Sequence, residues 1–206
     1  MLKIWGRISS VNVQKVVWAA DELGLAYERI EAGGAFGKTT TPEYLAMNPN
    51  SLVPVIEDDG FVLWESNAIV RYLAGKHARG TLWPNDDRKR ADADRWMDWQ
   101  ATTYTPAMWA AFWQLVRTPP DQRDAKVVEA SLAKTEKAAE ILEAALAGRQ
   151  FITGDAFTMG DIPIGCATHR WLNMPVWRVA RPNIERWYAA LKARPGGAKV
   201  LATPLT

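Results

Sequence analysis

The stretch Ser51-Leu-Val-Pro-Val-Ile-Glu-Asp-Asp-Gly-Phe-Val-Leu-Trp-Glu-Ser-Asn-Ala-Ile-Val-Arg-Tyr72 places two strands, a tight turn and the start of a helix in one short run. Its Asp59-Gly60 pair is a strong hairpin-turn signal. Val53-Pro54 opens the first strand, and proline stands at strand starts or edges because it cannot donate to a ladder. The helix starting at Glu65-Ser66 offers free backbone N–H groups and a hydroxyl to an anion. This layout predicts a place where a small peptide lies along a strand with its carboxylate at a helix end.

The residues around this stretch predict a small α/β domain over residues 1–79. Upstream, the patterns indicate a strand, a helix, a second strand and a short helix, at residues 2–6, 11–24, 27–30 and 42–47. The hairpin strands follow at 53–57 and 61–64, and the last helix at 65–77. The order β-α-β-α-β-β-α is that of the thioredoxin-like fold.

Beyond residues 78–86, which contain turn formers and no periodic pattern, every segment is typical of helix. We therefore expect a linker at 78–86 and an all-helical domain over residues 87–206. Its predicted helices cover roughly 87–116 and 121–147, then a helix opened by Thr158–Asp161 that runs to about 172, and one over 182–193, which Pro195-Gly-Gly197 follows. The Thr158–Asp161 segment has the spacing of a capping box, and we expect it to be structural.

Composition narrows the class of protein. The chain has 206 residues, 48% of them hydrophobic, and a net charge of +2, which is ordinary for a globular protein and favours neither nucleic acid nor a membrane as a partner. The N-terminus has no apolar signal core and Cys166 is the only cysteine, so we expect a cytoplasmic location and a buried, inert thiol. His77 and His169 lie far apart, and no spacing predicts a metal site.

Several short motifs occur together in the expected order. They are Ser9-Ser10-Val-Asn12 after the first strand, Asn48-Pro-Asn50, Val53-Pro54, Glu65-Ser66-Asn67-Ala-Ile69 and Thr158-Met-Gly-Asp161. With them the whole chain resembles the soluble glutathione S-transferases, and most of all the bacterial serine-type, theta-like members. The resemblance implies an enzyme that conjugates the glutathione thiolate to hydrophobic electrophiles, with peroxide reduction as a possible second activity. It also implies glutathione as co-substrate, no metal, and a homodimer.

The resemblance assigns the thiolate donor to the start of the first helix. Ser10 matches the hydroxyl residue of serine- and threonine-type members, Asn12 is a candidate second donor, and Ser9 is the reserve. A hydroxyl donor and a helix N-terminus both stabilise an anion, so this position suits a thiolate. Helix capping explains the same residue types equally well, and the sequence leaves open which of the three contacts the sulfur.

The resemblance also implies which residues bind the other parts of glutathione. It implies a cis Val53–Pro54 bond, with the N–H and C=O of Val53 holding the cysteinyl portion as an added strand. Glu65 and Ser66 would hold the γ-glutamyl ammonium and carboxylate. The glycyl carboxylate needs a donor from the loop at 36–41 or from the region of Leu52, and Lys38 and Thr39 are the candidates.

The second substrate is expected against the first long helix of the helical domain. Aromatic and sulfur side chains recur there at helical spacing, although core packing explains the same pattern: Tyr104, Met108, Trp109, Phe112 and Trp113. Two other functions compete with conjugation. One is a glutathione-dependent isomerase or dehalogenase that uses the same thiolate, and the other is a binding protein that keeps the fold without the chemistry.

Overall fold

The first domain of the computed structural model, which describes residues 1–206, is built on a four-stranded mixed sheet. The strands are β1 (Leu2–Trp5), β2 (Tyr27–Ile30), β3 (Val55–Asp58) and β4 (Phe61–Trp64), in the order β2-β1-β3-β4. β1 pairs parallel with β2 and antiparallel with β3, and β3 and β4 form the predicted hairpin. β3 begins two residues later than expected, so Val53 lies outside the ladder.

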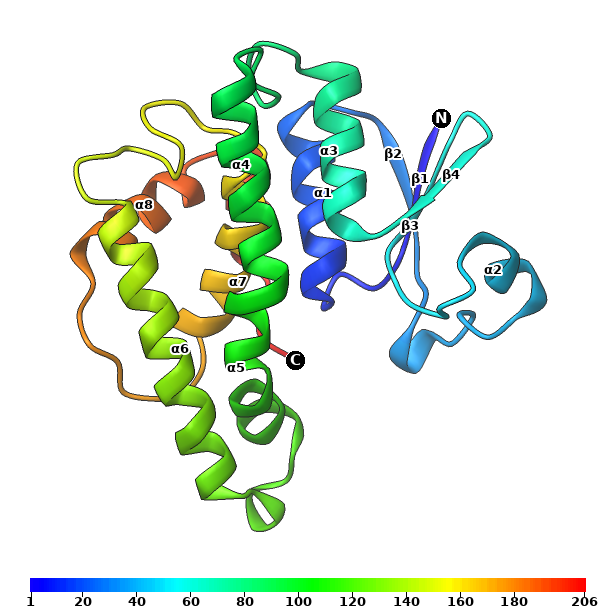
Figure 1. The fold of residues 1–206 in the computed structure, drawn as a ribbon. Helices are drawn as coiled ribbons and strands as arrows, with labels where there is room; N and C mark the ends of the chain where they lie inside the picture. The colour runs from blue at the N-terminus through cyan, green and yellow to red at the C-terminus, as the bar shows by residue number, and fades with distance from the viewer.

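Three helices flank this sheet (Figure 1). α1 (Val11–Glu22) and α3 (Ser66–His77) lie between the sheet and the helical domain, and α2 (Pro42–Met47) lies on the far side of the sheet. The apolar side chains of α1 at Val13, Val16 and Val17 are fully buried because α1 packs against α3 on one side and the helical domain on the other. The thioredoxin-like order predicted from the sequence is confirmed.

The helical domain is formed by six α-helices. They are α4 (Asp87–Trp99), α5 (Thr105–Phe112), α6 (Ala125–Ala145), α7 (Asp161–Leu172), α8 (Pro182–Lys192) and α9 (Pro195–Val200). Short 3-10 turns lie at Gly34–Phe36 in the first domain and at Pro120–Gln122 here. None of the helices combines the length and the apolar character needed to cross a membrane.

The single helix predicted over residues 87–116 is interrupted twice by π-helical turns, η2 (Gln100–Tyr104) and η3 (Trp113–Arg117). Pro106 gives a physical reason for the first turn, because it lacks the N–H that an α-helix would direct to the carbonyl of Thr102. The second turn carries Arg117 at its end. Such turns are often found at functional sites.

Helix α9 was not predicted, because its Pro-Gly-Gly start is typical of a chain break. The glycines are needed for packing instead. A Cβ on Gly196 would lie 2.4 Å from Trp18 Cδ1, and a Cβ on Gly165 of α7 would lie 2.9 Å from the same indole ring. Trp18 of α1 is fully buried in the space that these glycines leave. Tertiary packing against α1 therefore stabilises a helix that local propensity disfavours.

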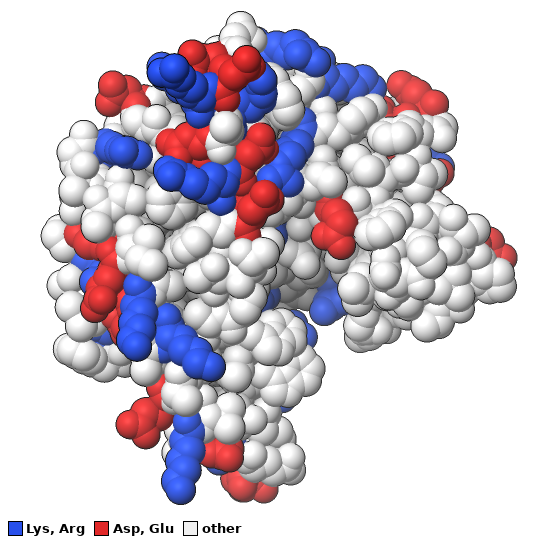
Figure 2. All heavy atoms as spheres, viewed as in Figure 1, with Lys and Arg blue, Asp and Glu red and all other residues white.

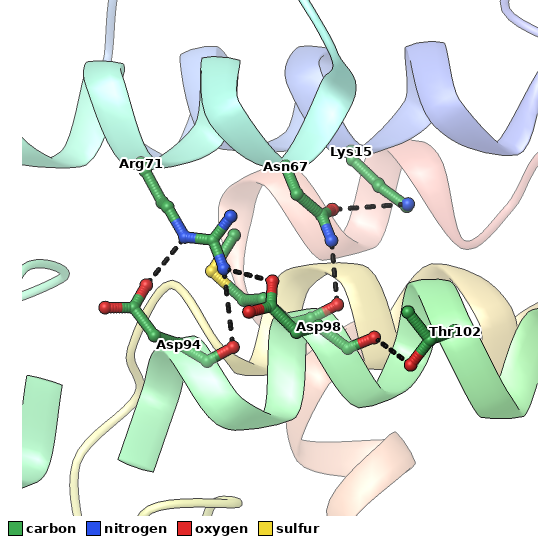
Figure 3. A network of polar contacts seen from close by, with 7 residues as sticks. Lys15, Asn67, Arg71, Asp94, Asp98 and Thr102 are labelled. Atoms are coloured by element: carbon green, nitrogen blue, oxygen red, sulfur yellow. Dashed lines mark hydrogen bonds and ion pairs between the residues drawn. The ribbon is translucent and has the colours of Figure 1, made fainter. Parts of the chain in front are cut away.

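A polar network fastens α3 to α4 across the two domains (Figure 3). Arg71 of α3 forms ion pairs with Asp94 at 2.6 Å and Asp98 at 2.5 Å. Asn67, one turn earlier, donates to the carbonyl of Met97 at 2.8 Å and accepts from Lys15 of α1 at 3.3 Å. These contacts fix the helical domain against the starts of α1 and α3, where the predicted site lies.

Candidate functional site

A cavity of about 260 Å³ lies where the first domain meets the helical domain. Figure 2 shows a hollow between the two halves of the molecule, with basic side-chain atoms at its floor. The wall draws on the loops around α1, the segment before β3, and helices of the second domain: Arg7, Ser10, Val11, Asn12, Gly33, Gly34, Thr39, Ser51, Leu52, Val53, Trp109, Arg117 and Arg170. A smaller cavity of about 50 Å³ adjoins it and shares Asn12, Leu52 and Val53.

Ser10 lies at the N-cap position of α1 with an extended backbone, φ −82° and ψ 122°. Its carbonyl accepts the first helical bond, from Gln14 N at 2.9 Å, but its side chain makes no capping hydrogen bond. The half-buried hydroxyl lines the larger cavity, next to the first-turn N–H groups that every helix leaves unpaired. The Ser10 hydroxyl is therefore free to donate to an anion seated at this helix end.

The two other candidates near Ser10 differ in position. Asn12 is exposed and lines both cavities, so its amide faces the junction between them. Ser9 lies in the preceding turn and is not part of the wall of either cavity. The geometry thus places Ser10 and Asn12 together, and it leaves Ser9 outside.

The segment before β3 presents unpaired backbone groups. The Val53–Pro54 peptide is cis, and neither the N–H nor the C=O of Val53 hydrogen-bonds within the chain. The preceding carbonyl of Leu52 is held by two donors, Tyr44 Oη and Asn48 Nδ2, each at 2.8 Å. Since buried Tyr44 and Asn48 fix this segment, the free groups of Val53 are held at the edge of the cavity.

Glu65 and Ser66 line the smaller cavity at the start of α3. Glu65 is exposed and adopts φ 73°, a left-handed conformation that is uncommon outside glycine and costs about 1–3 kcal/mol. Ser66 is buried, and its hydroxyl accepts a long hydrogen bond from Lys15 Nζ at 3.4 Å. The exposed carboxylate and the first N–H groups of α3 thus face the same small space.

The two loop candidates for binding the glycyl carboxylate differ in their position relative to the larger cavity. Thr39 lines the larger cavity, and its carbonyl accepts from the Ser51 hydroxyl at 2.8 Å. Lys38 is exposed and is absent from the wall. The backbone of Lys38 is left-handed, with φ 67°, as the chain leaves the turn at Gly37. Of this pair, only Thr39 is placed at the cavity.

The five aromatic and sulfur side chains expected to line the second-substrate site divide between two faces of one helix. Trp109 is 48% exposed and lines the cavity, and Trp113 is also exposed, with its ring 5.6 Å from that of Trp109, although it is not part of the wall. The expectation is wrong for the other three, which are fully buried in the core: Tyr104, Met108 and Phe112. Their four-residue spacing directs them together toward α6 and α7.

Three arginines in the wall were not predicted from the sequence: Arg7, Arg117 and Arg170. Arg7 lies in the β1–α1 loop and packs over Gly33 and Gly34, where any Cβ would approach its guanidinium within 3.0–3.2 Å. Arg170 is the one arginine on a helix that is otherwise buried along most of its length, and that contrast was the available sequence signal. For Arg7 and Arg117 no such signal exists.

Burial and neighbouring charges shift three pKa values close to the site. Burial lowers the pKa of Lys15 from 10.5 to about 8, and it lowers that of Arg170 to about 10, with further repulsion from Arg117. Burial raises the pKa of the Cys166 thiol to about 12, so this cysteine stays protonated. No group of three or more His, Cys, Asp or Glu side chains is placed to hold a metal ion.

The chain is similar in sequence to known proteins over its whole length. A family model described as the N-terminal domain of glutathione S-transferase matches residues 1–75, and one described as the C-terminal domain matches residues 125–190. The chain is 42% identical to glutathione S-transferase GstB of Escherichia coli (strain K12), with all of both proteins covered. It is 33% identical to the probable glutathione S-transferase GSTF2 of Oryza sativa subsp. japonica, covering 97% of this chain and 95% of that protein.

Among solved structures, the chain is similar to a theta class glutathione S-transferase from Xanthomonas axonopodis pv. citri with glutathione bound. The TM-score is 0.96 and the identity 45%, and the alignment covers 100% of this chain and 99% of the other. It is also similar to a glutathione S-transferase I bound with lactoylglutathione, with a TM-score of 0.89, 30% identity and 98% of both chains covered.

Proposed function

The chain belongs to the glutathione S-transferase family, and we propose that its two adjoining cavities bind glutathione with the thiolate at Ser10. The observation that carries the proposal is the unbonded Ser10 hydroxyl, which faces the cavity at the start of α1 beside the unpaired backbone groups of Val53. A hydroxyl, a helix N-terminus and a free strand edge are the partners that a cysteinyl residue with an ionised sulfur requires.

Each part of the tripeptide has a partner in this arrangement. The cysteinyl N–H and C=O pair with Val53 as an added strand. The γ-glutamyl carboxylate takes the Ser66 hydroxyl and the first N–H groups of α3, and Glu65 takes the ammonium. The glycyl carboxylate extends toward Thr39, where Arg7 lies over the neighbouring glycines.

The chemistry follows from the charge on sulfur. A free thiol ionises near pH 8.5, so lowering its pKa by about 2 units requires roughly 2.7 kcal/mol of anion stabilisation. A charge-assisted hydrogen bond contributes about 1.5–3 kcal/mol and a helix N-terminus up to about 1 kcal/mol more. In the transfer step the sulfur forms a bond to the electrophilic carbon, the leaving group departs with the bonding electron pair, and the thiol proton has already passed to solvent.

Exposed Trp109 supplies a flat wall for the second substrate, which favours hydrophobic electrophiles with a planar ring. Peroxide reduction and dehalogenation would use the same thiolate, and conjugation is favoured because the relatives are named as transferases. The same names, and the free hydroxyl at Ser10, count against a binding protein without chemistry.

The proposal includes a cytoplasmic homodimer. The single cysteine is buried and unpaired, as is usual in a reducing compartment. Exposed aromatic side chains on the edge strand β4, at Phe61 and Trp64, offer an apolar patch of the kind that associates with a second copy. Sedimentation of the purified protein measures the oligomeric state directly.

The test removes the Ser10 hydroxyl. We expect Ser10→Ala to lower kcat/KM with a neutral aryl halide by about 100-fold, the usual effect of losing one preorganised donor to a developing or resident anion. The melting temperature should stay nearly unchanged, because this hydroxyl makes no capping bond. Ultraviolet difference spectra of the saturated complex should show thiolate in the wild type near neutral pH and much less in the variant.

Ser9→Ala is the matched control, since Ser9 lies one residue away and outside both cavities. It should retain full turnover and the full thiolate absorbance. An unchanged rate in Ser10→Ala would remove Ser10 from the mechanism. If millimolar glutathione failed to raise the melting temperature of the wild type, the binding step itself would be refuted, because any ligand of the native state raises it.

A further inference from the structure

The helical-domain side of the larger cavity carries two arginines and no acidic side chain. Arg117 enters from η3 and Arg170 from α7, and no Asp or Glu is part of the cavity wall. Arg7 adds a third guanidinium from the first domain. Burial lowers the pKa of Arg170, and repulsion from Arg117 and Arg7 lowers it further. A concave surface with this charge distribution attracts an anion.

Arg170 is the strongest indication that an anion belongs here. Its side chain is 6% exposed, yet it forms no ion pair and no hydrogen bond within the chain. The guanidinium lies over the ring of Phe112, 3.9 Å from the centroid, and what remains exposed faces the cavity. None of its nitrogen atoms is fully buried, so the donors of this guanidinium stay accessible from the cavity without a hydrogen-bond partner in the chain, and an anion there would satisfy them.

Arg117 converges on the same place. Its guanidinium lies 5.2 Å from the ring centroid of Phe112, so Arg117 and Arg170 share one aromatic support. Two of its donors, on Nε and Nη2, reach the backbone oxygen of Thr206 at 3.3 and 2.9 Å. Nη1 remains without a partner. Guanidinium groups are well suited to carboxylates because their planar donors match both oxygens.

Two ligands could supply a carboxylate to this cavity: glutathione, through its glycyl end, and the second substrate. Thr39, Ser51 and Leu52 line the cavity from the first domain, along the path assigned to the glycyl end. Arg117 and Arg170 come from the helical domain, as Trp109 does, which is the side assigned to the second substrate.

We propose that Arg117 and Arg170 form a subsite for an anionic group on the electrophile, so that the enzyme prefers planar electrophiles that carry a carboxylate or a similar acid. This inference rests on the proposed function. The flat electrophile would lie along Trp109 with its acid group directed to the two guanidinium groups and its reactive carbon toward Ser10.

The test uses two aryl chlorides that differ only in charge, 4-chloro-3,5-dinitrobenzoate and 4-chloro-3,5-dinitrobenzamide. In both reactions the glutathione sulfur bonds to the ring carbon, the C–Cl bond breaks, chloride leaves with the electron pair, and the thiol proton is released to solvent. The kcat/KM of the benzoate divided by that of the amide, relative to the same ratio for the uncatalysed reaction, reports recognition of the acid group alone. Effects on the thiolate are common to both substrates and cancel.

We expect the wild type to favour the benzoate and Arg170→Met to lower the ratio by about 10-fold, which corresponds to about 1.4 kcal/mol. Arg117→Met, at a more exposed position, should lower the ratio by about 3-fold. Arg88→Met removes the same charge from an exposed position on α4 and should leave the ratio unchanged. If Arg170→Met does not fold, the half-buried Arg117 variant decides the question.

A ratio that stays within about 2-fold of wild type in the Arg170 and Arg117 variants would overturn the subsite. A rise in KM for glutathione with an unchanged ratio would also overturn it, since it would assign these guanidinium groups to the glycyl carboxylate. These outcomes differ from failure of the proposed function, in which the wild type would turn over neither chloride and glutathione would not raise its melting temperature.

Discussion

The starts of α1 and α7 look alike in the sequence and differ in the structure. Each start carries a short polar residue: Ser10 is the N-cap of α1, and Asp161 is the first residue of α7, directly after its N-cap Gly160. At α1, the Ser10 hydroxyl bonds to nothing and faces a cavity. At α7, both carboxylate oxygens of Asp161 are fully used, although the residue is completely buried.

Both carboxylate oxygens of Asp161 accept two hydrogen bonds each. Oδ1 accepts from Ile152 N and from Trp187 Nε1, each at 2.9 Å, and Oδ2 accepts from the N–H of Thr158 at 2.9 Å and its hydroxyl at 3.4 Å. The Thr158 hydroxyl does not complete the reciprocal half of a capping box, because the N–H of Asp161 goes to the Thr158 carbonyl.

The difference teaches how to separate structural from functional polar groups. A buried group whose hydrogen-bonding capacity is filled by the chain stabilises the fold and has nothing left for a ligand. A group whose capacity is unused beside a cavity has a ligand as its natural partner. The predictions below test this distinction at the starts of α7 and α3 and at Lys15 of α1, beginning with the largest expected effect.

Asp161→Ala should destabilise the protein by about 4 kcal/mol, because it leaves the N–H groups of Ile152 and Thr158 and the Trp187 indole without acceptors in the core. Urea unfolding at neutral pH measures this change. Any protein that remains folded should bind glutathione with normal affinity, since Asp161 lies outside both cavities.

Asp155→Ala is a suitable control, because Asp155 is exposed in the preceding loop and should change the unfolding free energy by less than about 0.5 kcal/mol. If Asp161→Ala were as stable as wild type and instead lost turnover, the proposed difference between a structural Asp161 and a functional Ser10 would be wrong.

The start of α3 combines both patterns. Ser66 is buried and its hydroxyl oxygen accepts from Lys15, which leaves the O–H free to donate, whereas the side chain of Glu65 is exposed and unbonded and its backbone has a positive φ. By the same reasoning, Glu65→Gln should weaken glutathione binding by about 10-fold or more, because an ammonium loses its charged acceptor, and leave stability unchanged. Titration calorimetry with glutathione measures the loss.

Glu28→Gln makes the same change at an exposed position on β2 and should bind like wild type. Equal affinity of the Glu65 and Glu28 variants would show that an unbonded, strained acid at a helix start does not by itself indicate a ligand.

The sequence was sufficient for the fold because its signals are local. The signals for the hairpin turn at Asp59-Gly60 and for the helix from Pro182 each span only a few residues, and both elements occur where expected. Helix α3 begins at Ser66, one residue after its predicted start. α9 was missed because its stabilisation comes from Trp18, far away in the chain. The family prediction is likewise confirmed, because it depends on short motifs in order.

The wall of the larger cavity was predicted only in part. Ser10, Asn12, Thr39, Leu52 and Val53 reach the larger cavity because they lie next to well-predicted turns of the first domain. The arginines were missed because residues 7, 117 and 170 meet only after the two domains pack.

The electrophile wall was misjudged for a geometric reason. Uniform helical spacing did not distinguish the face of Trp109 from the buried face of Tyr104, Met108 and Phe112, and the two π-turns that flank α5 had no sequence signal beyond Pro106.

Lys15 gives the smallest expected effect. It is a buried charge that donates to two residues at the start of α3, Ser66 and Asn67, and its bond to Asn67 is drawn in Figure 3. Burial lowers its pKa to about 8, below the value of 10.5 expected in the unfolded chain. Above pH 8 the folded protein therefore releases a proton that the unfolded chain keeps, and the contribution of Lys15 to stability rises with pH until about 10.5. Between pH 8 and about pH 9 this gain should be about 1 kcal/mol.

Lys15→Met cannot show this gain, so the unfolding free energy of wild type minus that of the variant should increase by the same amount over that interval. Lys89→Met, at an exposed position on α4, should follow the wild-type profile. Urea titrations at a series of pH values measure all three proteins. Parallel profiles for Lys15→Met and wild type would mean that the ammonium keeps an ordinary pKa, and that its bonds to Ser66 and Asn67 offset the cost of burial.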